Sequence, residues 1–133
     1  MARTLDSIDL MCIKWARTRR EVMGLEDPPL ASQYLGAIRS TLAAVKEMHD
    51  GTDQGPLKQH FPEVYVGRSF WVNRAFHNLP PLLRLTFDVH YAAKGLPPPD
   101  KAEALGIARS TYWARVSQAK AYVDDYVTTN EQD

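Results

Sequence analysis

A glycine between two helical patterns is the feature that most constrains the fold of this sequence. Gly106 separates a short helical segment, residues 100–105, from a longer one that begins near Arg109 or Ser110 and runs to about Val127. Glycine tolerates the positive φ that a tight turn between two helices requires. Ala102 is small enough to let the two helices cross closely, and Ile107 is placed to fill the core beneath the turn. The pattern predicts a helix-turn-helix.

The last predicted helix has one apolar face and one mainly polar face. Tyr112, Val116, Ala119 and Val123 recur at spacings of four, three and four residues, which predicts a single buried stripe, and Lys120 lies further along the polar side. Polar side chains off this stripe can reach base edges or phosphates when such a helix lies in a major groove. The candidate DNA-binding residues are Arg109, Ser110, Thr111, Trp113, Ala114, Arg115, Ser117 and Gln118.

A further helix is predicted before this motif. Asn78 is a suitable N-cap, and Pro80 and Pro81 fit a first turn, which needs no N–H donors. Gly95 is expected to stop this helix, and the prolines at 97–99 are expected to form a stiff connection to the short helix at 100–105.

The region from 78 to 126 resembles region 4 of bacterial sigma factors, especially the extracytoplasmic-function group. In that family the last helix enters the major groove, which implies that the residues near DNA are Arg109, Ser110, Thr111, Trp113, Ala114 and Arg115. The proline run at 97–99 with Lys101, and the bulky Trp113, depart from the family's usual pattern. The residues that carry the resemblance are Leu79, Pro80, Arg84, Phe87, Tyr91, Gly95, Ala102, Leu105, Gly106, Ile107, Thr111, Arg115, Val116 and Ala119.

The whole-chain layout is similar to that of Q-type antitermination proteins of lambdoid phages and prophages, of the small kind without a zinc site. The 77 residues before Asn78 are too few for a sigma factor that also melts the −10 element. The shared features are an N-terminal helix with a tryptophan, a middle helical segment and the C-terminal motif. The resemblance implies a protein that binds a promoter-proximal DNA element, loads onto paused bacterial RNA polymerase with its sigma factor, contacts nascent RNA and permits readthrough of terminators.

The N-terminal part is expected to be helical as well. A first helix is predicted over 7–23, with a stripe formed by Ile8, Met11, Cys12, Trp15 and Val22, and with Asp9 favourable in its first turn. A second helix is predicted over 30–49 and a polar loop over 49–56. A short extended piece over 61–66 and a helix over 69–76 are expected to follow.

Basic residues before Asn78 are the candidates for a second functional face, one that contacts polymerase or RNA. Basic residues near the C-terminal end of a helix are also favoured by the helix dipole, without any partner. The neighbouring aromatic residues Phe70 and Trp71 can likewise belong to the core rather than to a binding surface. The candidates are Lys14, Arg17, Arg19, Arg20, Arg68 and Arg74.

Length and composition predict one small all-α fold of about five to six helices. The 133 residues are 44% hydrophobic and 24% charged, and the 16 basic residues balance the 16 acidic ones, so any cationic surface must be local. We expect an N-terminal helical region over 1–77, the helix-turn-helix over 78–127 and a disordered tail over 128–133.

Other classes fit less well. The lone Cys12, expected to be buried, and four histidines without ligand spacing indicate no metal site and no cofactor, and no catalytic arrangement indicates an enzyme. The N-terminus is too polar for a signal peptide, which predicts a protein of the bacterial cytoplasm without a membrane partner. Two alternatives remain: an operator-binding activator or repressor that dimerises through its N-terminal helices, and a region-4 decoy that inhibits polymerase or sigma factor.

Overall fold

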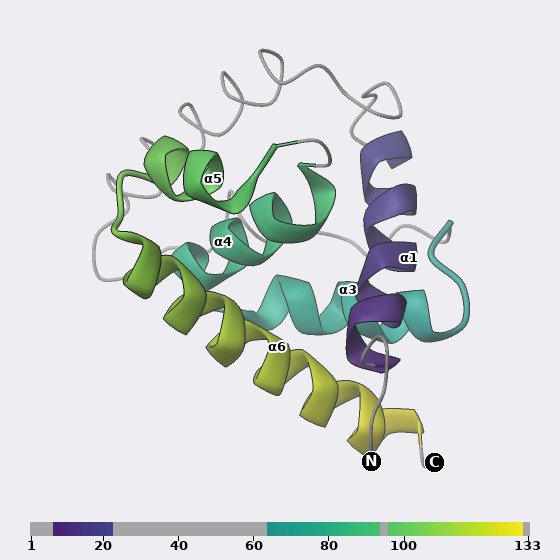
Figure 1. Cartoon of the computed structure of the whole chain (residues 1–133). Coiled ribbons are helices and arrows are strands. Elements are labelled where there is room, and N and C mark those ends of the chain that lie inside the picture. Colours follow the sequence, from purple (N-terminus) through teal and green to yellow (C-terminus); the bar gives the residue numbers. More distant parts are fainter. Residues whose placement is uncertain (1–6, 23–63, 94–95, 132–133) are drawn as a thin grey trace.

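The computed structural model describes residues 7–22, 64–93 and 96–131, and within these ranges the chain is helical without strands (Figure 1). This confirms the expected all-α class. The predicted helix over 30–49, the loop over 49–56, residues 61–63 and Gly95 lie outside the described residues. The helices are α1 (Ser7–Val22), α3 (Arg68–Asn78), α4 (Pro81–Ala92), α5 (Pro98–Leu105) and α6 (Arg109–Glu131).

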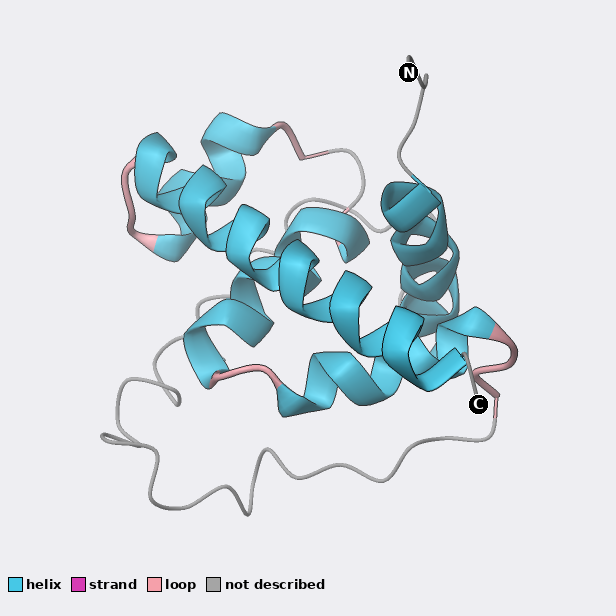
Figure 2. Ribbon diagram, turned by 90° about the horizontal axis from the view of Figure 1, so that it is seen from below, coloured by secondary structure: helices cyan, strands magenta, loops and turns pink. Residues whose placement is uncertain are grey.

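The long helix α6 is the support on which the other helices are arranged. Helices α3 and α4 pack along it, α1 packs on α3 and α4, and α5 packs on α4 and on the start of α6. Figure 2 shows α6 crossing the molecule from the end near α5 to the end where the C-terminus lies. At a rise of about 1.5 Å per residue, its 23 residues separate these two ends by roughly 35 Å.

One core joins the helices on both sides of position 78. Trp15 of α1 lies between Phe76 of α3 and Phe87 of α4, with ring centroids 4.8 and 5.3 Å away. These three rings are at most 2% exposed, and Trp15 Nε1 donates a 3.1 Å hydrogen bond to Asn73 Oδ1. Cys12 is fully buried beside them, as expected, and burial raises the pKa of its thiol. Helices α1 and α3 therefore share the core of the C-terminal helices.

The start of α4 differs from the sequence prediction. Asn78 is the last residue of α3 rather than an N-cap, and its side-chain amide donates a 2.9 Å hydrogen bond to the carbonyl of Arg74. Helix α4 begins at Pro81 after an extended Pro80, with no side-chain cap. The buried Arg84 stabilises this turn instead, since its Nη2 donates to the carbonyls of His77 and Leu79 at 3.0 and 3.1 Å.

Helix α5 begins two residues earlier than predicted. Pro98 and Pro99 form its first turn rather than a connection, because the first N–H groups of a helix have no acceptor within it. The turn after α5 is as predicted, since Gly106 has left-handed φ and ψ of 71° and 32°. The N–H of Ile107, which packs against the core, closes the turn on the carbonyl of Ala102 at 3.1 Å.

Helix α6 is longer than expected, and the predicted disordered tail is helical through Glu131. Val127 extends the buried stripe by one more position, and Arg68 Nε lies 2.7 Å from a carboxylate oxygen of Glu131. These contacts with α3 account for the additional turn. The helix starts at Arg109, so Ser110 is inside it and does not cap it.

Candidate nucleic-acid interface

The buried stripe of α6 fixes which of its side chains face outward. Tyr112, Val116, Ala119 and Val123 are each at most 2% exposed, as the apolar spacing predicts. Tyr112 and Val116 hold the first half of the helix against the core, so residues on the opposite side of the helical wheel point away from it. The orientation of the candidate DNA-binding residues is therefore set by packing rather than by the turn alone.

None of the eight candidate residues on α6 belongs to the core. Thr111 and Arg115 are half-buried at the edges of the stripe. The remaining six are exposed on the outer side of the helix, and they are Arg109, Ser110, Trp113, Ala114, Ser117 and Gln118. The structure thus brings the set together on one accessible surface, which we call the α6 face.

Charge is distributed unevenly along α6. Its first twelve residues contain Arg109, Arg115 and Lys120 and no acidic residue, whereas Asp124, Asp125 and Glu131 follow with no basic residue among them. Each half thus carries three charges of one sign. This order opposes the helix dipole, which favours acidic residues near the N-terminus and basic residues near the C-terminus. The stability of the isolated helix therefore does not explain the arrangement.

Within the described ranges, the two arginines of the α6 face make no compensating ion pair. Neither Arg109 nor Arg115 has an acidic partner there, whereas Arg19, Arg68 and Lys120 each have one. Lys120, by contrast, is turned toward α1, with its Nζ 3.1 Å from Asp9 Oδ1. The first half of α6 therefore presents two uncompensated guanidinium groups together with hydroxyl and amide side chains.

Trp113 is held in place although its ring is 46% exposed. Its ring stands edge-on to His90, 5.6 Å between centroids, and edge-on to Tyr112, at 5.3 Å. The exposed side of the indole is thus an anchored apolar surface beside Arg109. Such a surface can contact a thymine methyl group or the sugar of a nucleotide.

A buried polar network supports the α6 face from below. The hydroxyl of Tyr112 and Nδ1 of His90 lie 2.6 Å apart, and Lys101 Nζ donates a 2.7 Å hydrogen bond to the carbonyl of His90. The network joins α4, α5 and α6. Burial lowers the pKa of His90 to about 4 and that of Lys101 to about 8, so His90 is neutral at pH 7. The three helices are thereby held in one arrangement near neutral pH.

The basic residues of α1 do not form the single outward face that we expected. Arg19 makes two 3.2 Å hydrogen bonds to the carboxylate of Asp88 and lies over the Phe76 ring at 5.0 Å. Arg20 is 5% exposed, with Nη1 3.5 Å from the carbonyl of Ala92. Both arginines are directed toward α4 because their helical positions adjoin the buried stripe. The expectation that Arg19 and Arg20 belong to an external contact surface is therefore corrected.

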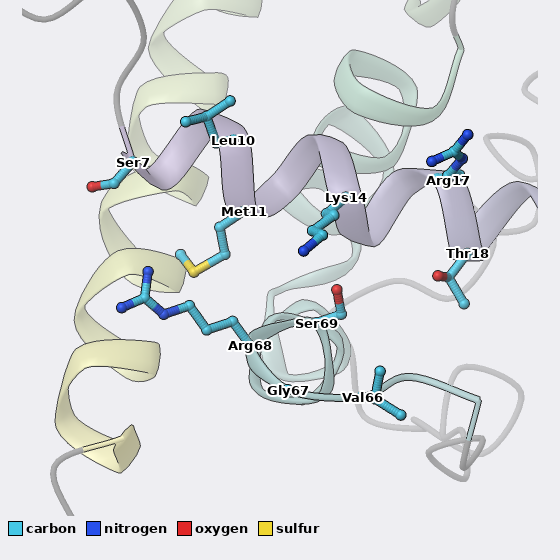
Figure 3. Close-up of a pocket in the computed structure, with 10 residues that line it drawn as sticks. All are labelled: Ser7, Leu10, Met11, Lys14, Arg17, Thr18, Val66, Gly67, Arg68 and Ser69. Atoms are coloured by element: carbon cyan, nitrogen blue, oxygen red, sulfur yellow. The ribbon is translucent and has the colours of Figure 1, made fainter.

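The other candidate cations of the N-terminal region separate into two groups. Arg74 is half-buried and lies 5.7 Å over the ring of Phe70, which packs against the core. Lys14 and Arg17 are exposed on α1, and they line a groove of about 560 Å³ together with Arg68 at the start of α3 (Figure 3). Of the six candidate cations, Lys14, Arg17 and Arg68 are therefore the three that line this groove.

Sequence reasoning did not find the contacts that join α1 to α4 and α6. Tyr91 donates a 2.5 Å hydrogen bond to Asp9, the carboxylate that also pairs with Lys120. Burial alone raises the pKa of Asp9, but these hydrogen bonds and the charge of Lys120 bring it below the usual value. The sequence offered Asp9 only as a favourable charge in a first turn. The partners of Asp9 in the structure, Tyr91 and Lys120, are 82 and 111 positions away in the sequence, so no local pattern could predict them.

The described ranges contain no group of three or more histidine, cysteine, aspartate or glutamate side chains arranged to hold a metal ion. None of the described helices combines the length and apolar character needed to cross a bilayer. Comparison with protein-family models, with curated proteins and with solved structures found no match to this chain.

Proposed function

We propose that this chain is a DNA-binding transcription antitermination factor without catalytic activity or cofactor, acting in the cytoplasm of a bacterial host. In this proposal α5 and α6 form the helix-turn-helix, and the first half of α6 lies in the major groove of a promoter-proximal element. The protein then loads onto paused RNA polymerase with its sigma factor and permits readthrough of terminators.

The observation that carries the proposal is the α6 face. Its two uncompensated arginines and its exposed hydroxyl and amide groups lie on a helix whose charge order opposes its own dipole. A phosphate bound near the start of such a helix is stabilised by the arginines, by the helix dipole and by the first backbone N–H groups. Arg109 and Arg115 are assigned to phosphate or guanine contacts, and Ser117 and Gln118 to base edges.

The anchored Trp113 is consistent with the same role. A side chain of this size on a recognition helix excludes some base pairs by shape and favours the methyl group of thymine. Because its contacts with His90 and Tyr112 restrict its motion, little side-chain entropy is lost on binding. We assign Trp113 to discrimination between sequences rather than to general affinity.

Selection from a random DNA duplex library tests the DNA-binding part of the proposal. The full chain should enrich one motif, and fluorescence anisotropy with that duplex should show binding that weakens with salt. The variants Arg109→Ala and Arg115→Ala should each reduce the slope of log affinity against log salt by about one. The matched variant Lys14→Ala, which removes an exposed cation of α1, should leave the slope unchanged. A library that yields no motif and no duplex binding would contradict the proposal.

A further inference from the structure

The groove between α1 and the start of α3 has a composition that suits a particular kind of ligand. Its lining includes three basic side chains, Lys14, Arg17 and Arg68, and the aliphatic side chains of Leu10, Met11 and Val66. We propose that this groove binds an acidic peptide segment of a partner protein, in which carboxylates alternate with large apolar side chains. The proposal does not rest on DNA binding, because the groove lies at the opposite end of α6 from Arg109.

Two of the three basic side chains of the groove, Lys14 and Arg17, have charges that no acidic residue of the described ranges offsets. Lys14 and Arg17 are three residues apart on one helix, where like charges repel each other by a few tenths of a kcal/mol. Within the described ranges no acidic residue lines the groove, and neither Lys14 nor Arg17 has an acidic partner there. This differs from Arg19 and Arg20 of the same helix, which bond to α4. The charges of Lys14 and Arg17 therefore remain available to a ligand.

The start of α3 adds to the positive potential at the groove. Gly67 precedes the helix with a φ of 60° and makes no side-chain cap, and no acidic residue occupies the first turn. The partial positive charge of this helix end is thus not offset locally. Arg68 pairs with Glu131, but its side chain is 59% exposed, and an exposed pair of this kind contributes little and can be exchanged for another carboxylate.

A polar side chain within the groove also lacks a partner. Ser69 is only 9% exposed, and no hydrogen bond to its hydroxyl is formed within the described residues. Figure 3 shows its oxygen directed toward α1, on the side from which the Lys14 amine approaches. The hydroxyl lines the groove, so a ligand in the groove can form a hydrogen bond with it. A carboxylate placed here would accept from both Ser69 and Lys14.

The apolar part of the lining decides between a peptide and a nucleic acid. Leu10 is 52% exposed and Val66 is 73% exposed, and both line the groove together with the buried Met11. Aliphatic side chains of this kind accept leucine or phenylalanine from a partner. None of the ten lining residues is aromatic, whereas single-stranded nucleic acids are held largely by stacking of bases on aromatic rings. The groove therefore fits an acidic, apolar peptide better than RNA.

The test uses the full chain, without DNA, and a fluorescein-labelled peptide in which leucine alternates with glutamate. We expect saturable binding by anisotropy that weakens about tenfold or more with Lys14→Glu combined with Arg17→Glu, because attraction becomes repulsion at two positions. The matched variant Arg109→Glu, which reverses an exposed charge at the far end of α6, should bind as the unchanged chain does. A peptide with glutamine in place of glutamate should not bind.

Two further measurements make the outcome unambiguous. Val66→Ser changes an exposed position outside the core, so the fold should persist by circular dichroism while peptide binding weakens. Labelled oligouridylate serves as the nucleic-acid probe. The proposal is overturned if the peptide does not bind the unchanged chain, if the double charge reversal leaves its affinity intact, or if oligouridylate binds through Lys14 and Arg17 more tightly than the peptide does.

Discussion

Arg19 and Asp88, 69 positions apart, are joined by two N–H···O hydrogen bonds of 3.2 Å in a largely buried setting. The pair fastens the second half of α1 to the middle of α4, and the guanidinium also covers the ring of Phe76. Two arginines that are two positions apart on α1 thus have different roles. Arg19 stabilises the fold, whereas Arg17 remains at the surface beside the groove.

The first prediction follows from this pair. Arg19→Ala should lower the free energy of unfolding by about 1–3 kcal/mol, because it leaves the Asp88 carboxylate poorly hydrated and without its donors. Arg17→Ala should change it by less than about 0.5 kcal/mol, as expected of an exposed side chain without a partner. Urea denaturation of the two variants checks the difference. Equal effects would show that the Arg19–Asp88 contact contributes nothing specific.

The second prediction concerns the turn before α6. A Cβ added at Gly106 meets no atom within 4 Å, so the cost of substitution comes from its left-handed backbone alone. Gly106→Ala should therefore destabilise the protein by about 1–2 kcal/mol. Gly106→Asn should cost less, since asparagine adopts this conformation more readily. Thermal or urea unfolding distinguishes the two variants, and a larger loss for asparagine would contradict a purely backbone effect.

The third prediction is a dependence of stability on pH. Burial lowers the pKa of both His77 and His90 to about 4, from an ordinary value of 6.5. The unfolded chain therefore takes up these protons first as the pH falls. Stability should be fully present above about pH 6.5 and should decline between pH 6.5 and pH 4.

Urea unfolding measured at several pH values checks this prediction, with His90→Gln as the diagnostic variant. Removing one of the two histidines should make the decline between pH 6.5 and pH 4 shallower. An unchanged slope would mean that His90 is protonated equally easily in the folded and unfolded chain.

The fourth prediction concerns Trp113. Trp113→Ala removes a half-exposed side chain, so it should have a modest effect on stability. Its main effect should be on discrimination, with the preferred base pair at one position of the selected DNA motif becoming less distinct. Repeating the duplex selection with the variant checks this. Uniformly weaker binding to all sequences would assign Trp113 to affinity instead.

The features that the sequence predicted well are those encoded locally. The spacing of Tyr112, Val116 and Ala119 defines a buried stripe without reference to any partner, and a glycine such as Gly106 is favoured where a left-handed turn follows a short helix. The same holds for α1, whose predicted bounds of 7–23 differ from the observed Ser7–Val22 by one residue. Local periodicity and turn chemistry were sufficient in these places.

The features that were missed depend on distant residues. Asn78 is a suitable N-cap by residue type, but the packing of Phe76 and Val72 in the core carries α3 through Asn78. The extension of α6 to Glu131 depends on contacts with α3. The assignment of Arg19 and Arg20 to an outer face failed because their partners on α4 cannot be inferred from the spacing of charges on α1.

Transcription in vitro is the measurement that links DNA binding by the α6 face to an action of the protein on polymerase. Bacterial RNA polymerase would transcribe from a promoter that carries the selected motif through an intrinsic terminator. If the protein is an antitermination factor, we expect readthrough that requires the motif and is lost with Arg109→Ala combined with Arg115→Ala. Readthrough should also be lost with Lys14→Glu combined with Arg17→Glu, although DNA binding persists. Unchanged termination with altered initiation would contradict this expectation in favour of an operator-binding regulator. No effect on either step, without DNA binding, would contradict it in favour of a decoy.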